Sequence, residues 1–457
     1  MKKTVVIDVV GLTPNAIGAN TPFLQQWSQS ARMASVGHVL PAVTCSVQAT
    51  YLTGKWPTEH GIVANGWYFR DECEPRLWRQ SNKLVEAPKI WEVAKAEDPT
   101  FTCANICWWY AMYSTADYAV TPRPQYLSDG RKLPDCYTYP LELRGQLEAK
   151  LGTFPLFDFW GPRTSIKSSQ WIAQAAIETD KRHDPTLTLV YLPHLDYNAQ
   201  RYGPADARVA ADLREIDTVC RDLATYFEGR GAQVIFLSEY GIAPVSRPIH
   251  LNRVLREHGY LSIREERGLE LLDAGTCQAF ALADHQVAHI YVNDATKIEA
   301  VRSLLAQVPG VEKIIGPEEK AAYHLDHPRA GELIAVAEKD AWFTYYYWLD
   351  DAKAPDFARI VDIHRKPGYD PVEMFADPTI KFLMPKVGLK LLRKKLGFRM
   401  LMDIIPLDAT LVGGSHGRPP ATPGEGPLLM SRRANLLPGD AIDAPAVFDV
   451  ILAHLRG

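Results

Sequence analysis

The run Leu187-Thr188-Leu189-Val190-Tyr191-Leu192 is followed, about 40 residues later, by a second apolar run, Val234-Ile235-Phe236-Leu237. Both runs are short, continuously apolar and rich in β-branched or aromatic residues, which is typical of strands buried on both faces. Between them, apolar residues recur at helical spacing, at positions 209, 213, 216, 220 and 223. A strand, a helix and a second strand predict a βαβ unit and therefore a mostly parallel sheet.

Acidic residues follow the strands of this predicted sheet. A third strand-like run, Thr4 to Ile7, leads directly into Asp8, and the two runs above are followed by Asp196 and Glu239. In open α/β sheets, ligands bind beyond the carboxyl ends of the strands. Acidic residues that converge there suit divalent metal ions, although any one of them alone is equally consistent with an ordinary loop residue.

The chain is long enough for an α/β core with helices on both faces and a smaller inserted α+β lobe. The lobe contains a strand, a helix and a strand over residues 288–292, 297–308 and 311–315. We expect the next strand, Glu332 to Ala337, to return to the main sheet. The first part of the core, the lobe and the second part of the core are accordingly predicted over residues 1–245, 246–334 and 335–457.

Composition restricts the class of partner. The 457 residues include 50 basic and 54 acidic ones, a net charge of −4, which does not favour nucleic acid as a bulk partner. A small phosphorylated substrate remains compatible, because a local site can be positive in a neutral protein. The seven cysteines form no paired CxxC motifs, and we find no signal peptide and no apolar run of 18 residues. We therefore expect a cytoplasmic protein without a membrane-spanning helix.

The segment Pro41-Ala42-Val43-Thr44-Cys45-Ser46 opens a predicted helix that ends at Gly54. Thr44 is expected at the helix N-terminus, where free backbone N–H groups and the helix dipole favour an anion. A hydroxyl group there, ionised by a nearby metal, is placed to attack phosphorus. The simpler alternative is that Thr44 only caps the helix.

The residues that follow, Lys55-Trp56-Pro57-Thr58-Glu59-His60-Gly61-Ile62-Val63-Ala64-Asn65, carry a family signature. Together with Asp8 and Thr44, they resemble the alkaline phosphatase superfamily, and within it most closely the nucleotide pyrophosphatase/phosphodiesterase family. The resemblance implies an alkaline phosphatase-like fold. It also implies that Thr44 is the nucleophile and a metal ligand, and that Asn65 binds a non-bridging phosphate oxygen.

The remaining metal ligands that the resemblance implies are partly substituted. A family histidine is replaced by Gln200, and an Asp-His pair is replaced by Glu239-Tyr240, whereas the final Ser/Thr-His-Gly run is kept around His416. This exchange of nitrogen for oxygen ligands suits Mn or Mg more than Zn. The implied set for two divalent metal ions is Asp8, Thr44, Asp196, Gln200, Glu239, Tyr240 and His416.

A compensating ligand is conceivable in Val361-Asp362-Ile363-His364. If a strand precedes an alternating Asp-x-His, both side chains face the same way, and His364 replaces a lost nitrogen. The alternative is a surface histidine in a charged loop. The substitutions also leave two interpretations open, an active enzyme with a re-tuned metal site or a relative that has lost catalysis.

The predicted function is metal-dependent hydrolysis of phosphate esters by a phosphodiesterase or nucleotide pyrophosphatase that uses a threonine nucleophile. The alternatives are a phosphomonoesterase, phosphonate hydrolase or phosphate mutase on the same core, and a non-catalytic protein that binds a phosphorylated ligand. Residues 381–399 are both basic and apolar. This segment is a candidate for peripheral contact with an anionic membrane or for binding a long phosphorylated substrate, or else it is a solvated face packed by its leucines.

Overall fold

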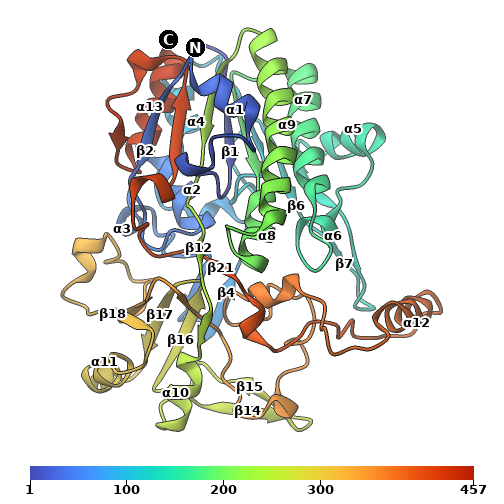
Figure 1. Ribbon diagram of the computed structural model, residues 1–457, viewed down its shortest axis with the longest axis vertical. Coiled ribbons are helices and arrows are strands. Elements are labelled where there is room, and N and C mark those ends of the chain that lie inside the picture. Colours follow the sequence, from blue (N-terminus) through green and yellow to red (C-terminus); the bar gives the residue numbers. More distant parts are fainter.

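The computed structural model describes residues 1–457 and consists of an α/β core with a smaller lobe beside it (Figure 1). The core contains a nine-stranded sheet in the order β23-β2-β22-β11-β1-β10-β5-β6-β9. Five of its eight strand pairings are parallel and three are antiparallel. The strands are β1 (Thr4–Val9), β2 (Arg32–Val36), β5 (Cys103–Ile106), β6 (Tyr118–Pro122), β9 (Cys136–Tyr139), β10 (Leu187–Leu192), β11 (Gln233–Leu237), β22 (Leu428–Ser431) and β23 (Ala441–Ile442).

The predicted βαβ unit is confirmed. Strand β1 lies at the centre of the sheet, between β10 and β11, and every residue of β1 and β10 is buried. Their continuous apolar sequences have no solvent face because helices cover both sides of the sheet. The carboxyl ends of β1, β10 and β11 therefore lie side by side, and Asp8 pairs in register with Tyr191 and Leu237.

Helices pack on both faces of the sheet, as expected. One group, α1 (Pro22–Ser28), α7 (Ile166–His183), α8 (His194–Tyr202) and α9 (Ala207–Gly229), packs together, and α2 (Thr44–Thr53), α4 (Ile90–Glu97) and α13 (Ala446–Arg456) form the second group. Figure 1 shows α13, α4 and α2 on one side and α9 and α7 on the other. The smaller core elements are α3 (Pro57–His60), α5 (Glu142–Leu151), α6 (Leu156–Phe159), and the hairpins β3–β4 (Gly66–Phe69, Glu74–Leu77) and β7–β8 (Gln125–Tyr126, Lys132–Leu133).

The lobe is built on its own antiparallel sheet, in the order β16-β17-β19-β18. Its strands are β16 (Ala279–Asp284), β17 (Val287–Val292), β18 (Val311–Ile315) and β19 (Leu333–Ala337), accompanied by α10 (Leu251–Glu257), α11 (Ile298–Leu305) and the hairpin β14–β15 (Ile263–Glu266, Leu269–Leu272). The expectation that the strand near 332–337 returns to the main sheet is wrong, because β19 pairs with β17 and β18. An apolar sequence indicates a buried strand, but it does not specify which of two sheets the strand joins.

Short strands connect the lobe to the core on either side of the insertion. β12 (Ala243–Pro244) pairs with β21 (Gly414–Ser415), which brings His416 back to the core, and β13 (Arg247–Ile249) pairs with β20 (Ala341–Phe343). The last helix before this return is α12 (Leu383–Lys395), which projects away from both parts of the molecule in Figure 1. Pro385 lies in its first turn, where a backbone N–H is not needed, so it does not prevent the helix. None of the helices has both the length and the apolar character of a membrane span.

Candidate active site

Thr44 is the first residue of α2, at the end of the sheet where the acidic residues converge. The N-cap position belongs to Val43, and no side chain caps the helix, so Thr44 does not serve as a cap. Its hydroxyl oxygen instead lies 3.2 Å from the hydroxyl oxygen of Tyr240. Both side chains line a pocket, which leaves the Thr44 hydroxyl available for chemistry.

Hydrogen bonds to Cys45 and Asp284 hold Asn65 next to Thr44. Its Oδ1 accepts the backbone N–H of Cys45 at 3.0 Å. Its own backbone N–H and its Nδ2 donate to the two carboxylate oxygens of Asp284 at 2.8 and 3.0 Å. Asp284 ends β16, so a residue of the lobe fixes the orientation of an amide in the core. One N–H of the Asn65 amide group remains available to a ligand.

Two buried carboxylates lie beside Thr44. Asp8 comes from β1, and Glu239 lies two residues after the end of β11. The Nε2 of Gln48 on α2 donates to Glu239 at 2.6 Å and to Asp8 at 3.4 Å. One oxygen of each carboxylate, Asp8 Oδ1 and Glu239 Oε2, has no hydrogen-bond partner. Burial raises the pKa of Asp8 to about 7. Burial, followed by repulsion from Asp8, raises the pKa of Glu239 well above its usual range.

A second group of ligand-type atoms surrounds Asp196 at the start of α8. Gln200 Nε2 and the Tyr240 hydroxyl donate to its carboxylate at 2.7 and 3.5 Å, and His416 Nε2 lies 3.8 Å from it. The Nδ1 of His416 lies 2.8 Å from the carbonyl oxygen of Ala42 and therefore donates to it. In the neutral imidazole, Nε2 then carries the lone pair, and this atom is buried without a partner. Burial lowers the pKa of His416 well below its usual range, so the ring is neutral.

These donor atoms fit divalent cations. Three buried carboxylates meet without a lysine or arginine partner, an arrangement that is costly unless a cation compensates the charge. The unpartnered oxygens of Asp8 and Glu239, together with Thr44 Oγ1, form one candidate site. Asp196 and the unpartnered Nε2 of His416 form the other. Oxygen atoms dominate both sets, which suits Mn or Mg.

Gln200 and Tyr240 occupy the positions of the missing histidines, and both are engaged in hydrogen bonds. The amide of Gln200 donates to Asp196 and accepts the hydroxyl proton of Tyr369 at 2.9 Å. The ring of Tyr240 stacks on that of His416, with centroids 3.6 Å apart. Burial and the charge of Asp196 raise the pKa of Tyr240 well above its usual range, so it is a neutral phenol. In this arrangement the two residues orient Asp196, His416 and Thr44.

His364 lies in the wall of the same pocket but is not joined to these groups. Its Nδ1 is 3.4 Å from the carbonyl oxygen of Leu77, its ring packs against Tyr126, and it has no hydrogen bond or ion pair to the residues described above. The strand expected before it does not form, because residues 361–370 contain no strand and residues 363–368 are turns and bends. The alternation that was expected to aim Asp362 and His364 in one direction is therefore absent.

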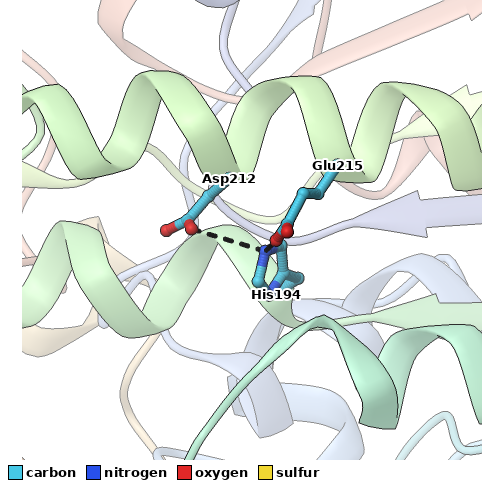
Figure 2. Close-up of side chains that lie close together, drawn as sticks. All are labelled: His194, Asp212 and Glu215. Carbon is cyan, nitrogen blue, oxygen red and sulfur yellow. Dashed lines mark hydrogen bonds and ion pairs between the residues drawn. The ribbon is translucent and has the colours of Figure 1, made fainter.

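His194, two residues before Asp196, faces away from that carboxylate. Figure 2 shows its Nε2 directed at Asp212 and Glu215 on α9, at 3.6 and 3.1 Å. Burial lowers the pKa of His194 to about 4, and burial raises that of Asp212 to about 6. The contact fixes α8 to α9 and thereby the position of Asp196.

Four residues of the site were not identified from the sequence, namely Gln48, Asp284, His285 and Tyr369. His285 is fully enclosed between Tyr369 and His416, with ring centroids 3.6 and 3.7 Å away. The available signal was the pair Asp284-His285, two polar residues between two apolar runs; Asp284 ends β16, His285 begins the turn, and both are buried. Gln48 had a comparable signal, as a polar residue one turn after Thr44 on a completely buried helix.

The pocket that begins at Thr44 and Asn65 has a volume of about 1170 Å³. Aromatic side chains line its inner part, including Trp78, Trp109 and Tyr369. Its lysines and arginines all come from the β7–β8 hairpin, residue 163 and the segment that contains α12, at positions 131, 132, 163, 394, 395 and 399. The elements that carry Thr44, Asp8, Asp196 and Glu239 contribute none of these basic residues.

Fold and site together define an alkaline phosphatase-like α/β protein with a threonine and buried carboxylates at the carboxyl end of its central sheet. The model of the type I phosphodiesterase / nucleotide pyrophosphatase family matches residues 4–370, and the chain belongs to this family. An uncharacterised pyrophosphatase/phosphodiesterase of Schizosaccharomyces pombe is 23% identical over 214 residues. That match covers 45% of this chain and 37% of the yeast protein, so the chain matches well under half of that relative.

Solved structures confirm the fold. Murine ectonucleotide pyrophosphatase/phosphodiesterase 5, as an inactive variant in complex with AMP, superposes with a TM-score of 0.61 at 14% identity. Phosphonoacetate hydrolase from Sinorhizobium meliloti, in complex with phosphonoformate, superposes with a TM-score of 0.62 at 15% identity. Each comparison covers 100% of this chain and 95% of the other.

Proposed function

We propose that this protein is a metal-dependent phosphodiesterase, of the phosphodiesterase/nucleotide pyrophosphatase type, in which Thr44 is the nucleophile. The observation that carries the proposal is the position of Thr44 Oγ1. It lies at the N-terminus of α2, uncapped, at the inner end of a large pocket and beside Asn65 and Tyr240. The murine relative that is described as inactive has a threonine replaced by alanine, which agrees with a threonine nucleophile.

Two divalent ions would be held by Asp8, Glu239 and Thr44 on one side and by Asp196 and His416 on the other. When bound, such ions polarise phosphate oxygens and lower the pKa of hydroxyl groups that they contact. The unpartnered carboxylate oxygens and imidazole nitrogen described above are the atoms available for this role.

The residues of the chain supply a route for the proton of Thr44. Its hydroxyl lies 3.2 Å from the Tyr240 oxygen, which in turn lies 3.5 Å from Asp196 Oδ1. As the bond from Oγ1 to phosphorus forms and the bond to the leaving oxygen breaks, the Thr44 proton passes to Tyr240, whose own proton passes to Asp196. The leaving oxygen takes a proton from solvent water. In the second step water attacks phosphorus and gives one proton to the solvent, the bond from phosphorus to Oγ1 breaks, and the proton held on Asp196 returns through Tyr240 to Oγ1. The net reaction converts a phosphodiester and water into a phosphomonoester and an alcohol.

Asn65 contributes through the N–H that it does not share with Asp284. This group can donate to a non-bridging phosphate oxygen, on which negative charge increases during the reaction. Because both the Asn65 amide oxygen and its other N–H are already bonded, the donor is held in place before the substrate arrives. Such pre-organised donors cost no reorganisation at the moment of reaction.

The charges of the inner pocket favour a diester over a monoester. A diester carries one negative charge and a monoester nearly two at neutral pH. The inner site has four carboxylates, Asp8, Asp196, Glu239 and Asp284, and no lysine or arginine, so a dianion would lack basic partners there. A monoesterase or phosphonate hydrolase on this core would be expected to place a basic residue beside the nucleophile.

A panel of two chromogenic esters tests the proposal. We expect bis-p-nitrophenyl phosphate to be hydrolysed faster than p-nitrophenyl phosphate, with Mn or Mg at least as effective as Zn. A faster rate with the monoester would favour the monoesterase alternative. No hydrolysis of either ester with any of the three metals, together with no bound metal by elemental analysis, would favour the non-catalytic alternative.

A further inference from the structure

The segment from Lys381 to Met402, which we call the basic arm, combines two properties that rarely occur together on a protein surface. It contains seven lysines and arginines and no acidic residue, although the whole chain has a net charge of −4. It also carries most of the large apolar side chains that the protein exposes. Its central element is α12, which projects from the body of the protein (Figure 1).

One face of α12 holds the helix against the protein. Lys386 and Lys390 form ion pairs with Asp403, at 3.6 and 2.5 Å. Val387, Leu391 and Lys394 line the pocket that begins at Thr44. Both the arm's attachment and the outer wall of the active-site pocket therefore depend on this side of the helix.

The opposite face has no partner. Leu389, Leu392 and Leu396 follow one another at helical spacing and are 59%, 52% and 65% exposed. Arg393 and Lys395 flank this stripe on its two sides, and both are exposed without an ion pair; Lys395 lies at the border with the pocket, which it also lines. Phe382, Met384 and Phe398 extend the apolar surface beyond the helix, at 77%, 75% and 61% exposure.

We propose that the basic arm docks on an anionic lipid bilayer and that the pocket behind it receives the hydrocarbon tail of a phosphorylated lipid. Leucines flanked by arginine and lysine are the pattern of helices that lie in the plane of a membrane interface. The absence of acidic residues matches anionic headgroups. The lack of acidic residues also disfavours a second copy of this chain as the binding partner of the arm, because two such arms would place like charges opposite each other.

The pocket supports the same substrate class. Apolar side chains from separate segments of the chain line it together with the basic residues named above, among them Leu156, Phe159, Ile360, Leu391 and Met402. A tail in this space would leave the phosphate group near Thr44 and Asn65, and the membrane-facing arm would lie at the pocket entrance. This substrate class rests on the proposed phosphodiesterase function, whereas the docking of the arm does not.

Vesicle flotation tests the docking independently of catalysis. The protein to use is Thr44→Ala, so that hydrolysis cannot alter the vesicles. We expect it to float with phosphatidylcholine vesicles that contain phosphatidylglycerol and to remain unbound with phosphatidylcholine alone, and we expect high salt to weaken the binding. Replacing Arg393 and Lys395 with glutamine should weaken binding to the anionic vesicles by about fivefold for each charge removed.

The apolar contribution has a matched control. Leu392→Gln/Leu396→Gln should reduce binding by at least about tenfold. Leu141→Gln/Leu349→Gln replaces two leucines elsewhere that are 75% and 50% exposed, and should bind like the parent protein. Because all four leucines are exposed, both variants should keep the parent's melting temperature. Unchanged binding by the Leu392/Leu396 variant, or equal binding to neutral and anionic vesicles, would overturn the docking proposal.

The dependence of KM on the length of the substrate's alkyl chain tests whether the pocket binds a hydrocarbon tail. For wild-type protein, the KM of alkyl p-nitrophenyl phosphates should fall as the alkyl chain lengthens, by up to roughly fourfold for each methylene group that enters the pocket. A KM that does not depend on chain length would overturn the lipid substrate. Absence of any hydrolysis would overturn the phosphodiesterase function instead, while vesicle binding would still decide the role of the arm.

Discussion

The replacement Asp284→Asn tests whether the lobe positions the catalytic amide. Asp284 is fully buried and accepts the backbone N–H and the Nδ2 of Asn65, and its Oδ1 also lies 2.8 Å from His285 Nδ1. The change keeps the size of the side chain but converts one acceptor into an N–H donor that faces another donor. We therefore expect Asn65 to turn away from Thr44.

The structure gives the expected size of the effects on folding stability and on turnover. Each buried donor left without an acceptor costs about 1–3 kcal/mol of folding free energy. Burial also raises the pKa of Asp284 to about 6, from an ordinary value of 3.8, so removing the charge at neutral pH recovers about 3 kcal/mol. These contributions nearly offset each other, and the melting temperature should change little. Turnover should fall about a hundredfold or more, because a pre-organised donor is lost.

The assay is hydrolysis of bis-p-nitrophenyl phosphate at saturating metal, with thermal unfolding measured on the same preparation. Asp217→Asn is the matched control, since Asp217 is also buried, its carboxylate also accepts two N–H groups, those of Phe23 and Leu24, and burial raises its pKa, but it joins α9 to α1 and has no contact with the candidate site. It should keep most of its turnover. Wild-type turnover in Asp284→Asn would refute the positioning role, as would a loss of turnover that only parallels unfolding.

Three further predictions follow from the same geometry. Tyr240→Phe removes the hydroxyl group that links Thr44 to Asp196 and should keep the ring stacked on His416, so turnover should fall strongly. Unchanged turnover at all pH values would show that the Thr44 proton leaves by another path. His416→Ala should lower the metal content that elemental analysis finds after dialysis. His364→Ala should leave the metal content unchanged, because His364 contacts Leu77 and Tyr126 instead. An equal loss of metal in both variants would show that His364 is a ligand. Burial lowers the pKa of His60 to about 3, so between pH 6.5 and pH 3 the unfolded chain binds a proton that the folded chain does not, and stability falls as pH falls through this window. His60 contributes about 2 kcal/mol to the loss of stability at pH 5 relative to pH 6.5, and other buried histidines add to it. The loss measured by urea unfolding should therefore be smaller by about 2 kcal/mol in His60→Gln, and a pH dependence identical to wild type would contradict this assignment.

Local sequence patterns predicted much of the core. Strands β1, β10 and β11 follow from continuous apolar runs, helix α9 follows from apolar residues at helical spacing, and helix α2 follows from its start and stop signals. The convergence of Asp8, Asp196 and Glu239 followed from the parallel arrangement of those strands. What the sequence could not specify was long-range pairing, as the placement of β19 in the lobe shows.

For the candidate site too, local sequence patterns identified some residues, whereas others depend on long-range packing. Thr44 and Asn65 were recognised because their surroundings in the chain form a motif. Asp284, His285 and Tyr369 were missed because they reach the site only through the packing of the lobe against the core. The roles of Gln200 and Tyr240 also depend on partners distant in sequence, and local spacing alone does not distinguish a metal ligand from a hydrogen-bond donor.

The most direct test of the central claim is to trap the covalent intermediate on Thr44. Wild-type protein, mixed with bis-p-nitrophenyl phosphate and Mn, is quenched in acid within the first turnover and digested for mass spectrometry. We expect a p-nitrophenyl phosphoryl group on the peptide that contains Thr44, since one p-nitrophenolate leaves and the other stays on phosphorus. This adduct should be absent from Thr44→Ala, which should fold normally but show almost no hydrolysis. Thr44→Ala protein that hydrolyses the diester at the wild-type rate would contradict the account.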